Sequence, residues 1–162
     1  MNVLSELVKK ANGNIKIKSA IAEKEYNFHW KSGLSIERIN DFEKETGILI
    51  PEYYKDFLML SNGGVIFDSG EDDGYELLGL AEIKSYTEEL KSDGYDIPDG
   101  CYCFLKCIFC DDVLLFDTKK TSNIILDGDV GYPVNKWEYL NMDLNTFFVR
   151  LVQCNGAMYW RW

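Results

Sequence analysis

The stretch that decides the fold is residues 36–64, which read IERINDFEKETGILIPEYYKDFLMLSNGG. Apolar residues recur at every third position in its first part, at Ile36, Ile39 and Phe42, which is the spacing of one helical face. Gly47 then fits the left-handed position at which helices often end. The sequence therefore predicts a short amphipathic helix that stops at Gly47.

A second short helix is predicted directly after the first. Pro51 suits its first turn, and an apolar stripe at positions i, i+3 and i+4 is supplied by Tyr54, Phe57 and Leu58. The run Asn62-Gly63-Gly64 ends it where the backbone needs a positive φ. Each residue type in the stretch thus has a structural role that requires no catalytic group.

The order and spacing of these residues resemble the signature of the SUKH superfamily, which includes the fungal SMI/KNR cell-wall regulators. A weaker likeness continues through residues 78–83 and 111–117 and into a helix around 146–148. We therefore expect one SUKH-like domain over residues 1–162, in which residues 1–33 are an unmatched N-terminal extension.

The resemblance implies a function as well as a fold. For a bacterial protein it implies a non-enzymatic immunity protein that binds and neutralises a cognate secreted toxin, polymorphic or contact-dependent. Many toxins opposed by this superfamily are nucleases, which carry a basic groove for their substrate. The resemblance to the fungal regulators implies the alternative, a scaffold or regulator that assembles proteins without blocking an active site.

We expect a single α+β domain in which a mixed, largely antiparallel sheet is flanked by helices, with the helical pair 36–60 on one side. Period-two alternation, apolar runs and turn residues between them predict the strands, near residues 15–18, 26–30, 65–67, 76–78, 102–109, 113–117 and 124–126. Helical periodicity predicts further helices at residues 1–10, 80–91 and 144–151. Asp143 is the expected N-cap of the last helix.

Composition places the chain among globular proteins. It has 162 residues, 46% of them hydrophobic, and no apolar run approaches the roughly 18 to 20 residues of a membrane span. The first residues lack the basic and then apolar segments of a secretory signal. We therefore expect a cytoplasmic protein that does not bind a membrane.

The net charge of −10 is concentrated in one part of the chain. Residues 68–129 contain sixteen acidic residues against five lysines, a net of −11, so the rest of the chain sums to +1. Many of these acids lie in segments typical of loops, at 68–74 and 93–100, which contain glycines, and at 111–112. Such a surface repels phosphate backbones, so a basic protein partner is favoured over nucleic acid.

We predict that these acidic loops, with two neighbouring tyrosines as aromatic anchors, contact the partner. The predicted contact residues are Asp68, Glu71, Asp72, Asp73, Tyr75, Asp93, Tyr95, Asp96, Asp111 and Asp112. Loops between strands tend to collect at one edge of a sheet, which would bring the acids together. The alternative is that the acidic run is a solvated face that supports solubility.

Four of the five cysteines lie within ten residues, at Cys101, Cys103, Cys107 and Cys110. A zinc site is one interpretation, but structural zinc sites usually take two ligand pairs separated by a dozen or more residues. The gap between the pairs here is three residues, and the intervening side chains are mostly apolar. We favour buried thiols in a strand that act as small hydrophobes, and we expect no metal.

The sequence contains no recognised catalytic motif. The sole histidine, His29, lies in an alternating aromatic segment, and no G-x-S-x-G, P-loop or G-x-G-x-x-G motif is present. The carboxylates lie mainly in loops, where burial strong enough to raise a pKa is not expected. We expect neither enzymatic activity nor a cofactor.

The run 158–162, MYWRW, has three aromatic residues in its last four positions. One interpretation, which we favour, is that it folds back to cover the core. The other is an exposed binding segment, because Trp, Tyr and Arg are enriched at binding hot spots.

Overall fold

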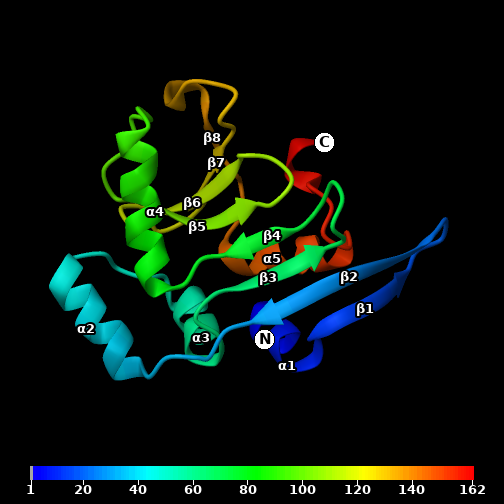
Figure 1. The fold of residues 1–162 in the computed structure, drawn as a ribbon. Coiled ribbons are helices and arrows are strands. Elements are labelled where there is room, and N and C mark those ends of the chain that lie inside the picture. Colours follow the sequence, from blue (N-terminus) through cyan, green and yellow to red (C-terminus); the bar gives the residue numbers. More distant parts are fainter. Residues whose placement is uncertain (1) are drawn as a thin grey trace.

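Eight strands form one open sheet whose spatial order follows the chain from β1 to β8 (Figure 1). The computed structural model describes residues 2–162. The strands are β1 Gly13–Lys18, β2 Glu23–Trp30, β3 Gly64–Asp68, β4 Tyr75–Leu77, β5 Cys101–Cys107, β6 Val113–Asp117, β7 Ile125–Gly128 and β8 Glu138–Tyr139. Antiparallel pairing, which the sequence predicts to predominate, joins every pair of neighbours from β1 to β8. The seven predicted strands are confirmed, and β8 is an addition.

Each predicted helix is present in the structure, although residue 1 of the predicted helix 1–10 lies outside the described residues. The α-helices are α1 Val3–Lys10, α2 Ile36–Thr46, α3 Glu52–Leu60, α4 Leu80–Ser92 and α5 Leu144–Gln153. Two short 3-10 helices, η1 Val134–Lys136 and η2 Tyr159–Arg161, were not expected from the sequence. Among residues 2–162, none of the helices has the length and apolarity needed to cross a membrane.

Helices cover both faces of the sheet (Figure 1). α1, α3 and α5 pack against one another, and α2 packs against α3. Tyr75 points to the face of α5, because its hydroxyl donates to the carbonyl of Gly156 just after that helix. Lys106 points to the other face, where its ammonium lies 4.4 Å from the ring centroid of Tyr86 in α4. The arrangement is a single α+β domain, as the sequence predicts.

The helical pair is built as its sequence indicates. Ser35 Oγ accepts the N–H of Arg38 at 3.2 Å and caps α2, and Gly47 ends the helix with φ +73°. The residues of its apolar faces that reach the core are Ile39, Phe42, Tyr54, Phe57 and Leu58. Their burial supplies the hydrophobic stabilisation that holds the pair on the domain.

The run Asn62-Gly63-Gly64 joins three elements at one point. Asn62 Oδ1 accepts the N–H of Leu80 at 2.8 Å and so satisfies the start of α4. Gly63 has φ +97°, and a Cβ there would lie 2.9 Å from the carbonyl oxygen of Leu77. A Cβ on Gly64 would lie 2.6 Å from the carbonyl oxygen of His29 on β2. These residues are therefore required by backbone geometry and close approach.

Residues 2–30 share the sheet and the core with the rest of the domain. β1 and β2 form a hairpin that projects from the sheet, and β2 pairs with β3 (Figure 1). Leu4 of α1 is fully buried, and the rings of Phe28 and Phe67 meet edge to face with centroids 5.0 Å apart. The segment that lies outside the family resemblance is thus packed on the same core.

The cysteine cluster lies in and just after β5. Cys101, Cys103 and Cys107 are buried and Cys110 is partly exposed, which confirms the predicted strand of buried thiols. Burial raises the pKa of Cys101 to about 11, so its thiol stays protonated at neutral pH. Within residues 2–162, no group of three or more metal-ligating side chains converges.

Candidate partner-binding surface

Three loops meet at one end of the sheet. The β3–β4, β5–β6 and β7–β8 loops leave from the same end because Tyr75 pairs with Ile66 and Cys107, and Val113 pairs with Gly128. Hydrogen bonds also join these loops to one another. Ile108 N–H donates to the carbonyl of Gly74 at 3.0 Å, and Val130 N–H donates to Asp112 Oδ1 at 3.0 Å.

Six of the predicted contact residues lie at this end, where they stem from the β3–β4 and β5–β6 loops. They are Asp68, Glu71, Asp72, Asp73, Asp111 and Asp112. Glu71, Asp72 and Asp111 are exposed, whereas Asp68, Asp73 and Asp112 are partly buried. The structure therefore collects these acids, as the loop argument predicts.

The segment 93–100 reaches the surface at a different place. It leads from the end of α4 to Cys101, at the start of β5, and Cys101 pairs with Asp117 at the opposite end of the sheet from Cys107. Asp93 and Asp96 are exposed there. The sequence predicts that the acidic segments 68–74, 93–100 and 111–112 collect at one edge of the sheet. The 93–100 segment lies elsewhere, because α4 carries the chain away from that edge.

The β7–β8 loop lies between the two sets of acids. On one side its Val130 binds Asp112, and on the other Trp137 meets the partly buried Tyr95 with ring centroids 5.9 Å apart. A groove lined by residues 94–99 and 130–135 separates this loop from the 93–100 segment. The loop was not among the predicted contact residues, although its position makes it central to the surface.

Lys24 of β2 partly neutralises the β3–β4 loop. Its ammonium lies 2.5 Å from Asp73 Oδ2 and 3.8 Å from Asp72. Burial opposes ionisation of Asp73, but hydrogen bonds from Lys24 and Ser69 outweigh it and lower the pKa of the carboxyl. Asp73 therefore orders the loop, while Asp72 and Glu71 keep most of their surface in solvent.

Tyr75 is a core residue, which corrects its assignment as an exposed anchor. Its side chain is 0% exposed and packs against Phe109 and Trp160. The hydroxyl donates to Gly156 O at 2.8 Å, and burial raises the pKa of the phenol well above its usual value. The alternation of buried and half-buried residues in Tyr75-Glu76-Leu77 is the strand pattern that places this ring inside.

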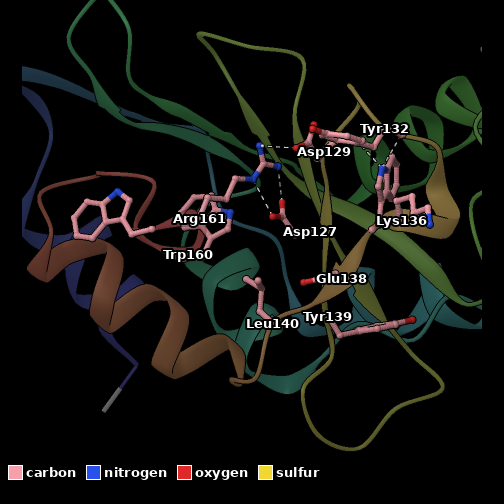
Figure 2. A pocket seen from close by; sticks show the side chains of 11 residues that line it. Asp127, Asp129, Tyr132, Lys136, Glu138, Tyr139, Leu140, Trp160 and Arg161 are labelled. Atoms are coloured by element: carbon pink, nitrogen blue, oxygen red, sulfur yellow. Dashed lines mark hydrogen bonds and ion pairs between the residues drawn. The ribbon is translucent and has the colours of Figure 1, made fainter.

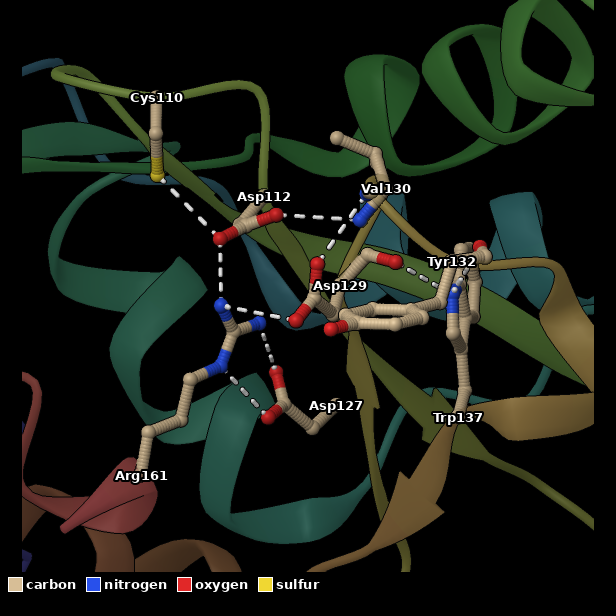
Figure 3. Close-up of polar contacts among 9 residues, drawn as sticks. Cys110, Asp112, Asp127, Asp129, Val130, Tyr132, Trp137 and Arg161 are labelled. Carbon is tan, nitrogen blue, oxygen red and sulfur yellow. Dashed lines mark hydrogen bonds and ion pairs between the residues drawn. The ribbon is translucent and has the colours of Figure 1, made fainter.

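Arg161 contacts three carboxylates from two neighbouring segments at the loop end, the β5–β6 loop and the end of β7 (Figure 3). Its Nε and Nη2 donate to the two oxygens of Asp127 at 2.9 and 2.7 Å, a bidentate pair. Nη1 donates to Asp112 Oδ2 at 2.5 Å and lies 3.6 Å from Asp129 Oδ2. The hydrogen bond to Asp127 is the main reason that the pKa of Arg161 rises above its usual value. The carboxylate of Asp112 therefore forms an ion pair within the molecule.

The segment that contains Arg161 folds back over the core, as the favoured interpretation of the run 158–162 predicts, but it also presents an exposed residue. Tyr159 Oη donates to the carbonyl of Phe147 at 2.9 Å, and the Trp160 ring lies 5.1 Å from that of Phe147. Trp162, in contrast, is 87% exposed. Sequence reasoning missed the partners of Arg161, because they lie 34 and 49 residues away along the chain.

A groove of about 630 Å³ lies beside this cluster (Figure 2). Figure 2 shows Arg161 pointing toward Asp127 and Asp129, with Tyr132 and Lys136 of the β7–β8 loop near them. The residues that line it are Asp127, Asp129, Tyr132, Lys136, Trp137, Glu138, Tyr139, Leu140, Trp160, Arg161 and Trp162. We call it the β8 groove.

Comparison with known families identifies residues 33–148 as a match to the SMI1 / KNR4 family (SUKH-1). The chain belongs to this family. The match confirms the resemblance noted in the sequence and covers the elements from α2 into α5. Residues 154–162, which carry Arg161, lie beyond the part matched to the SMI1/KNR4 family.

Two relatives from Bacillus subtilis (strain 168) are similar over most of their length. The uncharacterized protein YnaB is 33% identical over 140 residues, which covers 82% of this chain and 86% of the relative. The uncharacterized protein YobM is 30% identical over 140 residues, which covers 79% of this chain and 70% of the relative.

Proposed function

We propose that this protein is a cytoplasmic, non-enzymatic immunity protein that binds a cognate secreted toxin and occludes its active site. The observation that carries the proposal is membership of the SMI1/KNR4 (SUKH-1) family, whose bacterial members are generally non-catalytic immunity proteins. This role requires no catalytic residue, metal or cofactor.

The charge of the surface supports a basic toxin as the partner. A nuclease needs a positive groove for its substrate, and an acidic protein surface is complementary to such a groove. The exposed acids Glu71, Asp72 and Asp111 lie at the loop end, and Asp93 and Asp96 lie across the β7–β8 loop from them. We assign these residues to steering the encounter with the toxin.

The partly buried acids have a supporting role in this proposal. Asp73 is held by Lys24 and Ser69, and Asp112 is held by Arg161. Their carboxylates fix the loops that present the exposed acids. Rigid presentation favours affinity, because less conformational freedom is lost when the toxin binds.

A test of the function starts from the neighbouring genes. We expect one of them to encode a long secreted protein with a C-terminal toxin domain. Expression of that domain alone should stop growth of a host, and co-expression of this protein should restore it. The purified pair should form a stable complex in which the activity of the toxin is lost.

A deletion experiment separates the immunity role from a scaffold role. Loss of an immunity gene should kill cells only when the toxin gene is intact or when neighbouring cells deliver the toxin. Loss of a scaffold should cause a defect whether or not the toxin gene is present. Equal growth defects in toxin-deleted and toxin-intact cells would overturn the immunity role.

A further inference from the structure

The β8 groove has aromatic side chains on its exposed rim. Tyr132 is 61% exposed and Trp162 is 87% exposed, although large aromatic side chains are usually buried in a folded domain. Tyr132 also lines the second groove, beside residues 94–99, so it stands where the two grooves meet. Exposed aromatic residues that rim a groove are typical of protein interaction sites.

The base of the groove is rigid. Arg161 is fixed by the bidentate pair with Asp127 and by Asp112, and each of these carboxylates is 14% exposed. Trp160 packs on Phe147 and Tyr75. Trp162 follows directly on these anchored residues, so its backbone is held beside the groove while its ring stays exposed.

One carboxylate of the groove is unpaired and a second is only partly used. The Oδ1 of Asp129 accepts the N–H of Gly131 at 3.1 Å, whereas its Oδ2 lies 3.6 Å from Arg161 Nη1, beyond hydrogen-bond distance, and the side chain is 35% exposed. Glu138 is exposed and has no ion pair within residues 2–162. The two cations Arg161 and Lys136 face four carboxylates at or next to the groove, those of Asp112, Asp127, Asp129 and Glu138. The local charge is therefore negative even with Arg161 in place.

Exposed aromatic faces combined with carboxylates that are not fully paired select a cationic side chain. In general a guanidinium can stack on an aromatic ring and donate to a carboxylate at the same time, which the compact ammonium of lysine does less well. Arg161 already shows that this end of the sheet binds a guanidinium through carboxylates.

We propose that the β8 groove receives an arginine side chain of the basic toxin, and that Tyr132 and Trp162 are the aromatic anchors of the interface. This inference rests on the proposed function and names the site within it. It moves the centre of the interface from the acidic β3–β4 loop to the β7–β8 loop and residues 160–162. The outer acids then steer the toxin, and the groove retains it.

A defined peptide tests the chemistry of the groove. Acetyl-triarginine amide, titrated into the isotopically labelled protein, should give saturable NMR shifts of the Trp162 indole N–H and of the amides around Tyr132. Acetyl-triglutamate amide should give none. Triarginine shifts that are absent from the groove, or that appear only at the β3–β4 loop, would overturn the proposal.

A matched pair of variants removes the effect of net charge. Glu138→Lys in the groove and Glu45→Lys on α2 make the same change of charge at two exposed positions. We expect Glu138→Lys to weaken triarginine binding by about tenfold or more, and Glu45→Lys to weaken it much less. Equal effects of the two substitutions would show non-specific attraction and overturn the site.

The toxin domain identified by growth arrest supplies the decisive comparison. If the wild-type protein does not protect cells, the proposed function fails, whatever the groove binds. If the wild-type protein protects, the double variant Tyr132→Ala/Trp162→Ala should dissociate from the toxin domain at least about tenfold faster and lose protection. Ile21→Ala, at the 96% exposed hairpin tip, is the control for loss of an exposed apolar side chain. An unchanged dissociation rate in the double variant, with its fold intact by circular dichroism, would overturn the groove while leaving the function standing.

Discussion

Gly63 shows how one position joins backbone conformation to packing. It needs a positive φ, and a Cβ would also lie 2.9 Å from two backbone atoms, Leu77 O and Gly79 N. Gly70 has a similar positive φ, of +78°, but a Cβ there would meet nothing within 4 Å. Comparing the two positions therefore separates the cost of a positive φ from the cost of a steric clash.

We predict that Gly70→Ala lowers the free energy of unfolding by about 1 to 2 kcal/mol, the usual cost of a left-handed residue with a Cβ. Gly63→Ala should cost roughly 1 to 3 kcal/mol more, because the colliding atoms are backbone and cannot rotate away. Urea unfolding of both variants measures the difference. Equal losses of unfolding free energy in the two variants would mean that the backbone around Gly63 moves to accommodate the Cβ at no cost.

Asp73 makes stability depend on pH with a definite sign. Hydrogen bonds from Lys24 and Ser69 lower the pKa of Asp73 in the folded protein below its ordinary value of 3.8. A depressed folded pKa stabilises the protein above the unfolded value, and this contribution is lost as the pH falls through the folded value.

Asp73→Asn should therefore lower the free energy of unfolding at pH 7, and the gap from wild type should narrow as the pH falls below 3.8. Unfolding curves at a series of pH values measure the gap. The exposed Asp72→Asn is the control and should show a smaller gap. A gap for Asp73→Asn that stays constant down to pH 2 would contradict the assigned role of its carboxylate.

The helices and strands could largely be predicted from the sequence, because local periodicity determines them. α2, α3 and α5 follow the apolar spacing, and Asp143 caps α5 as expected by accepting the N–H of Thr146 at 2.7 Å. β8 has two residues, too few for any alternation to be seen. Its place is set instead by pairing with β7, which is a tertiary interaction.

The binding surface could be predicted only in part. The sequence indicates which loops are acidic, and strand order explains why two of them meet. It does not reveal that α4 carries residues 93–100 to the other end of the sheet, or that Arg161 reaches back to Asp112 and Asp127. These features depend on contacts between residues far apart in the chain.

The N-terminal elements give a further prediction. α1, β1 and β2 lie outside the family match, which begins at residue 33, yet Phe28 packs on Phe67 and the Trp30 ring lies 6.1 Å from that of Phe57. A protein that lacks residues 1–33 exposes this part of the core and the edge of β3.

We therefore expect the truncated protein to lose its cooperative unfolding transition and to aggregate. Near-ultraviolet circular dichroism and urea unfolding measure this outcome. Ile21→Ala at the 96% exposed hairpin tip, which leaves α1, β1 and β2 in place, is the control. Cooperative unfolding of the chain without residues 1–33 would show that the extension is dispensable for a stable fold.

In the proposed interface, different parts of the molecule attract the toxin and hold it. The acids around the β7–β8 loop would give long-range attraction, which salt screens, whereas the β8 groove would give short-range contacts. Charge changes on the outer loops should therefore act on the association rate, and changes in the groove should act on the dissociation rate. A solvated acidic face without a partner would affect neither rate.

The measurement that tests this most directly is the association rate of the protein with the toxin domain at several salt concentrations. The variant to compare with wild type reverses four exposed acids, Glu71, Asp72, Asp96 and Asp111, and its control reverses four exposed acids of α2 and α3, Glu37, Asp41, Glu45 and Asp56. Asp73 and Asp112 are left unchanged, because they hold ion pairs inside the protein. We predict that the loop variant associates more slowly, with a flatter dependence on salt, and that the control changes much less. An association rate and a salt dependence in the loop variant equal to those of the control would contradict the account and place the toxin-binding surface elsewhere on the molecule.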